Sequence, residues 1–205
     1  QKTYELVDCD AGILALDFAV EETLDKIEGS DAHNMNDDQI VSSSWGLDCE
    51  WRPSFMSGEM NPVATLQLSS SSRSFVIDLQ TLCQGGVATN STQLKETEKS
   101  LSETLSKLFL SRKIRIIGFG ITQDLSKLAA SFPHIPCFHE LHSVLDLQSL
   151  SRFAYPRMPK QFMSSLQKAT SIILRKRMDK TEQCSEWNSR PLRNSQLEYA
   201  SLDAT

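Results

Sequence analysis

Two carboxylates stand two residues apart, as Asp48 and Glu50, within the largely apolar run 45–51. In a strand, side chains alternate between faces, so both acids point the same way and Cys49 points into the core behind them. Two like charges on one buried face repel each other and lose hydration, which is unfavourable unless a cation lies between them. A divalent metal ion would supply that cation, whereas two hydrated acids on an exposed edge strand would need none. The pair alone leaves both interpretations open.

Three more side chains have types and positions suited to the same chemistry. Asp124 lies in the first turn of an expected helix, directly after the apolar run 114–120, where the helix dipole favours an ionised acid by ~0.3–1 kcal/mol. Tyr199 and Asp203 are four residues apart in a helical segment, so the phenol and the carboxylate share one face. The alanine after each lets that face approach a sheet. Alone, each feature also fits an ordinary helix.

The elements that must position these residues predict an α/β fold. Short strands are expected at residues 3–7, 44–50, 62–68, 74–79 and 114–120, the middle three forming an antiparallel meander. Helices are expected from a cap at Asp8 or Asp10 to about Gly29, at 93–110, from a cap at Thr122, at 147–153, at 161–174 and from 194 onward. Polar loops are expected at 30–39 and 84–92. A meander followed by a helix, a buried strand and another helix predicts a mixed sheet with helices on its faces.

Length and composition place limits on the class of protein. The 205 residues predict one domain. The sequence contains no run of about 18 apolar residues, so no membrane span is expected. The chain begins with Gln1 and shows no signal-peptide pattern, so we expect a domain cut from a longer protein. Five scattered cysteines without a C-x-x-C pair favour free thiols and a reducing compartment. We expect a monomer in the cytoplasm, with the nucleus as the alternative.

The net charge of −5 hides a strongly basic segment. Residues 147–178 contain no acid and seven cations: Arg152, Arg157, Lys160, Lys168, Arg175, Lys176 and Arg177. A basic segment of this kind can attract phosphate groups even on an acidic protein. The alternative is the solvated face of two ordinary helices.

In chain order, the Asp-x-Glu strand, Asp124 and the Tyr-x-x-x-Asp helix resemble the motifs of the DEDD exonucleases of the ribonuclease-H-like fold. Tyr199 places the resemblance in the DEDDy subclass. Residues 179–187 (DKTEQCSEW), 190–192 (RPL) and 196–200 (QLEYA) resemble the segment before the last motif in ribonuclease D relatives. Together with the Asp-Cys-Glu-Trp strand, they are most similar to the Nibbler branch, whose members trim the 3′ ends of small RNAs. The resemblance covers about residues 44–205.

The resemblance implies a ribonuclease-H-like mixed sheet with helices on both faces, forming one 3′-5′ exonuclease domain at residues 1–205. It implies two Mg²⁺ or Mn²⁺ ions about 3.5–4 Å apart, bridged by Asp48. Glu50 and Asp203 would complete the first metal site, and Asp124 would hold the second ion largely through water. Tyr199 would orient or help deprotonate the attacking water. Nucleoside 5′-monophosphates would leave from the 3′ end.

Four residues before the last helix are candidates for substrate binding: Lys180, Gln183, Ser185 and Trp187. Lys180 is expected to contact the scissile phosphate, while Trp187 either stacks on a base or anchors the core. The sequence leaves three alternative functions open. The first is an exoribonuclease acting on single-stranded RNA ends, small RNAs above all, with a small-RNA-carrying protein as a candidate partner. The others are a Werner-type DNA exonuclease and a non-catalytic RNA-binding scaffold.

Overall fold

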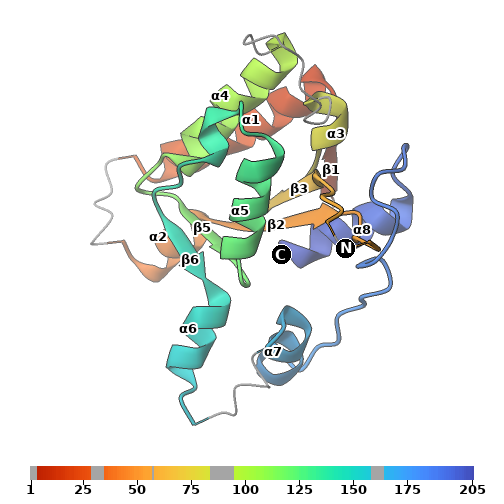
Figure 1. Cartoon of the computed structure of the whole chain (residues 1–205). Coiled ribbons are helices and arrows are strands. Elements are labelled where there is room, and N and C mark those ends of the chain that lie inside the picture. The colour runs from red at the N-terminus through yellow and green to blue at the C-terminus, as the bar shows by residue number, and fades with distance from the viewer. Residues whose placement is uncertain (1–3, 29–34, 57, 84–94, 158–163) are drawn as a thin grey trace.

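One mixed sheet runs through the computed structural model, which describes residues 4–28, 35–56, 58–83, 95–157 and 164–205. Within these ranges the sheet has six strands in the order β1-β4-β3-β2-β5-β6 (Figure 1). They are β1 (Tyr4–Val7), β2 (Ser44–Trp51), β3 (Val63–Ser69), β4 (Ser74–Asp78), β5 (Arg115–Gly118) and β6 (Val144–Asp146). The β2–β3 and β3–β4 pairs are antiparallel, and the other three are parallel. The predicted meander is confirmed. The three-residue β6 was missed because it is too short to show a periodic pattern.

Helices cover both faces of the sheet. On one face, α1 (Asp10–Lys26), α4 (Glu96–Phe109) and α5 (Thr122–Ser131) bury a large apolar cluster against the strands. On the other face, α8 (Asn194–Asp203) packs on a smaller cluster that includes Ala64, Val76 and Ala200. The predicted mixed sheet with helices on both faces is therefore confirmed. No helix among the described residues has the length and apolar character needed to span a membrane.

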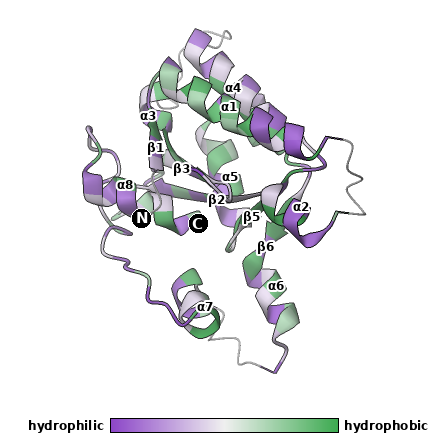
Figure 2. Ribbon diagram, turned by 180° about the vertical axis from the view of Figure 1, so that it is seen from behind, coloured by the Kyte–Doolittle hydropathy of each residue, from purple (hydrophilic) through white to green (hydrophobic). Residues whose placement is uncertain are grey.

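The shorter elements connect these layers. They are α2 (Asp37–Ser42), α3 (Leu79–Leu82), the 3-10 turn η1 (Pro136–Phe138), α6 (Leu147–Ala154) and α7 (Leu166–Ile173). In both views α6 and α7 extend away from the sheet, each with hydrophobic and hydrophilic residues (Figures 1 and 2). They correspond to the expected helices 147–153 and 161–174, of which residues 161–163 lie outside the described residues.

Several predicted boundaries were wrong for local reasons. The loop expected at 30–39 contains the start of α2, because Asn36 and Gln39 form a capping box. Residues 30–34 of that loop, and the loop expected at 84–92, lie outside the described residues. Thr122 is the first residue of α5 rather than its cap, which is Ile121. Neither expected acid caps α1, since its N-cap residue is Cys9 and Asp10 is already helical. That helix ends at Lys26, before the expected Gly29.

Candidate active site

The acidic strand β2 lies inside the sheet, between β3 and β5. The edge-strand interpretation of its two acids is therefore wrong. Leu47 and Cys49 belong to the large apolar cluster on one face, as the two-residue period predicts. Asp48 and Glu50 face the opposite side, and Glu50 is only 7% exposed. A carboxylate in such a position has lost most of its water and needs compensation from the protein or from an ion.

The end of α8 brings a third carboxylate to this face. Carboxylate oxygens of Asp48, Glu50 and Asp203 all lie within 4.8 Å of one another. The approach is close because Gly46 has no side chain: a Cβ built there would lie 1.8 Å from the carbonyl oxygen of Ala204. A glycine inside a strand is a signal of such close backbone approach. Gly46 is therefore the one residue in the sequence that signals this approach of α8 to β2.

Hydrogen bonds fasten the end of α8 to the meander. The Thr205 hydroxyl lies 3.2 Å from the Ser69 Oγ on β3 and 3.4 Å from the Ser74 Oγ on β4. It also donates to the Ser201 carbonyl oxygen at 2.7 Å. These contacts hold the last turn of the helix, and with it Asp203, in register with the sheet.

Asp124 lies next to this group of three, in the first turn of α5 where the sequence predicts it. It is outside the 4.8 Å group. Of all neighbouring charges, however, that of Asp124 has the largest effect on the pKa of Asp48, which it raises. Burial raises the pKa of Asp124 itself to about 7. The Asp146 carboxylate accepts the Gly120 N–H at 2.8 Å and so positions the turn that precedes α5. The structure thus brings all four predicted acids to one end of the sheet.

Burial and repulsion from neighbouring acids make Asp48 and Glu50 difficult to ionise. Burial, followed by the charges of Asp124 and Asp203, raises the pKa of Asp48 to about 8. Burial, followed by the charges of Asp48 and Asp203, raises the pKa of Glu50 to about 9. The Lys180 ammonium opposes both shifts without cancelling them. The cluster therefore attracts either protons or a cation of higher charge.

Lys180 and Tyr199 form the remaining side of the site. The Lys180 Nζ donates to the Asp203 Oδ2 at 2.8 Å and to the Tyr199 Oη at 3.1 Å. Burial, together with the Asp203 charge, raises the pKa of the Tyr199 phenol above its usual value. The phenol consequently stays protonated near neutral pH. It can orient a water molecule by hydrogen bonding, and it is a weak general base.

Acids on a central strand, on a following helix and on a late helix form a pattern that can be compared with known proteins. Residues 25–205 match the 3′-5′ exonuclease family. The chain belongs to this family. Among its relatives, exonuclease mut-7 of Caenorhabditis elegans is 28% identical over 169 residues, covering 78% of this chain and 17% of that protein. The chain therefore spans about a sixth of the length of this curated relative.

Solved structures show the same fold. The Aedes aegypti Nibbler EXO domain superposes with a TM-score of 0.67 at 24% identity, covering 97% of this chain and 81% of that chain. The Trypanosoma brucei RNase D complex with RNA U12 gives a TM-score of 0.68 at 18% identity, covering 100% and 59%. Identities this low show the fold alone. With the family match, they confirm the predicted resemblance to ribonuclease D relatives and the Nibbler branch.

The other predicted substrate residues lie on the segment 179–192 that precedes α8 in this exonuclease-family chain. Gln183 is exposed, whereas the Ser185 Oγ accepts a hydrogen bond from the Gln196 Nε2 at 2.9 Å. Trp187 is 0% exposed, and its ring lies 6.2 Å from the Tyr199 ring. It therefore offers no face to a base. Of its two interpretations, the core anchor is the one that the structure has.

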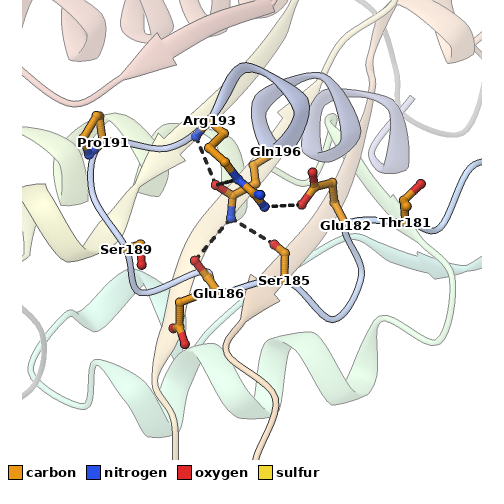
Figure 3. A pocket seen from close by; sticks show the side chains of 8 residues that line it. All are labelled: Thr181, Glu182, Ser185, Glu186, Ser189, Pro191, Arg193 and Gln196. Carbon is orange, nitrogen blue, oxygen red and sulfur yellow. Dashed lines mark hydrogen bonds and ion pairs between the residues drawn. The ribbon is translucent and has the colours of Figure 1, made fainter.

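A pocket of about 570 Å³ opens beside this segment, at the N-terminal end of α8 (Figure 3). Arg193 and Glu182 form part of its lining and make an ion pair of 2.6 Å with each other. The full lining is Thr181, Glu182, Ser185, Glu186, Ser189, Pro191, Arg193 and Gln196. Because Asp203 lies at the opposite end of the helix, the pocket is separate from the carboxylate cluster.

Arg190 anchors the same segment to the sheet, a role that our sequence analysis missed. Its guanidinium binds the Asp78 carboxylate with two contacts, of 2.6 and 2.7 Å, and donates to the Trp187 carbonyl oxygen at 2.7 Å. Bidentate pairs of this kind fix orientation as well as position. The only signal in the sequence was the Arg-Pro-Leu run, which gives no partner. Asp78 is distant in the chain and carries no motif of its own.

The raised pKa values predict how the stability of the metal-free chain depends on pH. Folded Asp48 and Glu50 have pKa values of about 8 and 9, against ordinary values of 3.8 and 4.5, so the folded state binds more protons than the unfolded state. Their contribution is complete below about pH 4 and is lost as the pH rises through about 8–9. In EDTA, we expect the free energy of unfolding to fall between about pH 5 and 9 by more than about 1.4 kcal/mol, the equivalent of one pKa unit.

Urea denaturation at about pH 5, 7 and 9 measures this dependence. The Glu50→Gln variant is the control, since it removes one of the two groups and should show a flatter profile. A wild-type profile that rises with pH, or one identical to that of Glu50→Gln, would contradict the assignment.

Proposed function

We propose that this chain is a metal-dependent 3′-5′ exoribonuclease that shortens single-stranded RNA from its 3′ end and releases nucleoside 5′-monophosphates. The observation that carries the proposal is the group of three carboxylates within 4.8 Å, with Asp124 and Tyr199 beside it in DEDDy order. Membership of the 3′-5′ exonuclease family supports the direction of digestion. The structural likeness to RNase D in complex with RNA U12, and to the Nibbler EXO domain, supports RNA as the substrate.

The donor set of the cluster fits hard divalent ions. Only carboxylate oxygens converge there, and these suit Mg²⁺ or Mn²⁺ rather than a structural zinc. Asp48, Glu50 and Asp203 would hold one ion, and Asp48 with Asp124 would hold a second. When bound, such ions lower the pKa of a water molecule and stabilise negative charge at phosphorus and on the leaving 3′ oxygen.

The protein's own groups position the reactants. The neutral Tyr199 hydroxyl orients the attacking water, and Lys180 holds this hydroxyl and Asp203 in fixed relation. The Lys180 side chain is 21% exposed, so the ammonium remains accessible to a phosphate oxygen at the scissile bond. Gln183 is exposed beside it and is available to the substrate, whereas Ser185 acts through its hydrogen bond to Gln196.

The natural substrate and surroundings are part of the same proposal. The likeness to the Nibbler EXO domain favours the 3′ ends of small RNAs, delivered by a protein that carries them. We propose a monomer in a reducing compartment, the cytoplasm or the nucleus, in keeping with five free cysteines, three of them buried.

The test of the function uses single-stranded RNA and DNA of one sequence, labelled at the 5′ end and incubated with Mg²⁺ or Mn²⁺. We expect a ladder of 3′-shortened RNA products that is absent with Asp48→Ala and with Asp203→Ala. Equal or faster digestion of DNA would favour the Werner-type alternative. Binding of RNA without digestion would favour the non-catalytic scaffold.

A thermal melt tests the metal site without catalysis. An ion that binds only the folded state at about ten times its Kd stabilises the chain by about 1.4 kcal/mol. For a chain of 205 residues this corresponds to a rise in Tm of about 3–6 °C. We expect this rise with millimolar Mg²⁺ or Mn²⁺ in the wild type and none in Asp48→Ala. No rise, or the same rise in both, would refute the site.

Replacing Lys180 by Ala should impair both binding and turnover. The change removes the donor that holds Tyr199 and Asp203, as well as the cation available to the phosphate. We expect kcat on labelled RNA to fall by about 100-fold, the usual effect of deleting one preorganised donor, and KM to rise. Lys113→Ala, at an exposed position, is the matched control. Unchanged kcat and KM in Lys180→Ala would exclude this role.

A further inference from the structure

We call residues 147–157 and 164–178 the basic arm, and this part of the chain has a strongly basic exposed surface. It carries six of the chain's 21 Lys and Arg residues and none of its 26 acids. Lys160, the seventh cation of the predicted basic segment, lies outside the described residues. Within the described part of the chain, no carboxylate forms a salt bridge with the exposed cations Arg152, Arg157, Arg175, Lys176 and Arg177.

Two aromatic side chains lie between two of these cations in the sequence, where α6 ends. Residues 152–157 read Arg-Phe-Ala-Tyr-Pro-Arg. Phe153 is 84% exposed and Tyr155 is 44% exposed. Exposing a large aromatic ring to water is unfavourable. The neighbouring arginines form no ion pair with a described carboxylate, so packing within the chain does not explain why these rings are exposed. Exposed rings between cations are the chemistry of single-stranded nucleic-acid binding, where bases stack on the rings and cations contact the phosphates.

Each end of the basic arm adjoins a segment that carries a residue of the candidate site, Asp124 at the start and Lys180 at the end. At its start, Asp146 caps α6 through the Gln148 N–H at 2.9 Å and accepts the Gly120 N–H of the turn before Asp124 at 2.8 Å. At its end, the Gln167 Nε2 on α7 donates to the Met178 carbonyl oxygen at 3.1 Å, two residues before Lys180. The helices α6 and α7 of the arm extend away from the sheet (Figure 1).

We propose that the basic arm is a sequence-tolerant binding surface for single-stranded RNA, on which nucleotides upstream of the 3′ terminal one stack against Phe153 and Tyr155. Arg152 and Arg157 contact the phosphates of these nucleotides. The occupant is a polyanion because the exposed cations of the arm lack carboxylate partners among the described residues. The inference rests on the proposed function for the identity of its ligand and for the direction of the strand.

Fluorescence anisotropy with a labelled 12-nucleotide oligo(U) in EDTA tests the surface independently of catalysis. The double variant Phe153→Ala/Tyr155→Ala should bind at least tenfold more weakly, since each stacked base contributes strongly to affinity. Arg152→Gln/Arg157→Gln should reduce the slope of log affinity against log salt by about 1.4, at ~0.7 for each phosphate contact. The matched controls are Phe18→Ala, which removes a ring that is 65% exposed, and Arg112→Gln, also exposed.

RNA length provides the second measurement. With Mg²⁺, both arm variants should raise KM for the 12-nucleotide RNA about tenfold, leave kcat unchanged and leave the hydrolysis of a three-nucleotide RNA unaffected. Wild-type affinity in both arm variants, or equal losses in the two controls, would overturn the proposal, the first result leaving the exposed rings to a protein partner. If RNA binds through the arm but no RNA is shortened, only the proposed function fails.

Discussion

Replacing Asp48 by Asn is expected to lower the rate of 3′ shortening by at least about a thousandfold, or ~4 kcal/mol of transition-state stabilisation. The carboxylate lies within 4.8 Å of two others and would be shared by both metal ions, so its loss affects every ligand contact of the site. The amide has nearly the same volume, so the packing of β2 is kept. Initial rates on 5′-labelled RNA with Mg²⁺ provide the measurement.

The same substitution should make the metal-free chain more stable above about pH 8. The pKa of the wild-type Asp48 carboxyl group is about 8, so above this pH the group is ionised. Its charge then lies beside Asp124 and Asp203. The uncharged amide avoids this repulsion, so we expect a higher Tm in EDTA for Asp48→Asn. Asp25→Asn, at an exposed position of α1, should change neither activity nor Tm. Loss of activity together with a lower Tm would indicate misfolding instead, and full activity would exclude Asp48 as a ligand.

Replacing Gly46 by Ala should disable the site without touching any of its chemical groups. The new Cβ would lie 1.8 Å from the Ala204 carbonyl oxygen, whereas real contacts are longer than 3.0 Å, so the end of α8 must retreat by more than about 1 Å. Overpacking of this kind costs about 1–3 kcal/mol, or a fall in Tm on the order of 2–12 °C. A displacement of about 1 Å at a catalytic group can cost about 100-fold in rate.

The Gly46→Ala chain should also lose most of the Tm rise with Mg²⁺, because Asp203 moves with the helix. Ala130→Ser, an exposed position on α5, adds one atom outside the site and should retain activity, Tm and the metal response. Wild-type rates in Gly46→Ala would show that α8 can shift without consequence. They would then contradict the close packing of the helix on β2 as the device that places Asp203.

Residues that share one element could be arranged from the sequence. A period of two places Asp48 and Glu50 on one face and Cys49 in the core, and the helical period places Tyr199 and Asp203 on another. Both depend on backbone geometry within a few residues, which is why the structure agrees. The family motifs then connected the elements in order, and the mixed sheet follows from the alternation of strands and helices.

Contacts between distant elements required the tertiary structure. Lys180 bonded to Tyr199 and Asp203, Arg190 bonded to Asp78, and the burial of Trp187 all depend on how the segment 179–192 lies on the sheet. That placement results from the packing of the whole core rather than from any local periodicity. The sequence alone determined which groups could hold a metal ion and the order in which they occur. Only the tertiary structure decided that three of them meet within 4.8 Å, through the packing of α8 against Gly46. The reason is that the distance between two elements depends on how the side chains of the whole core pack together.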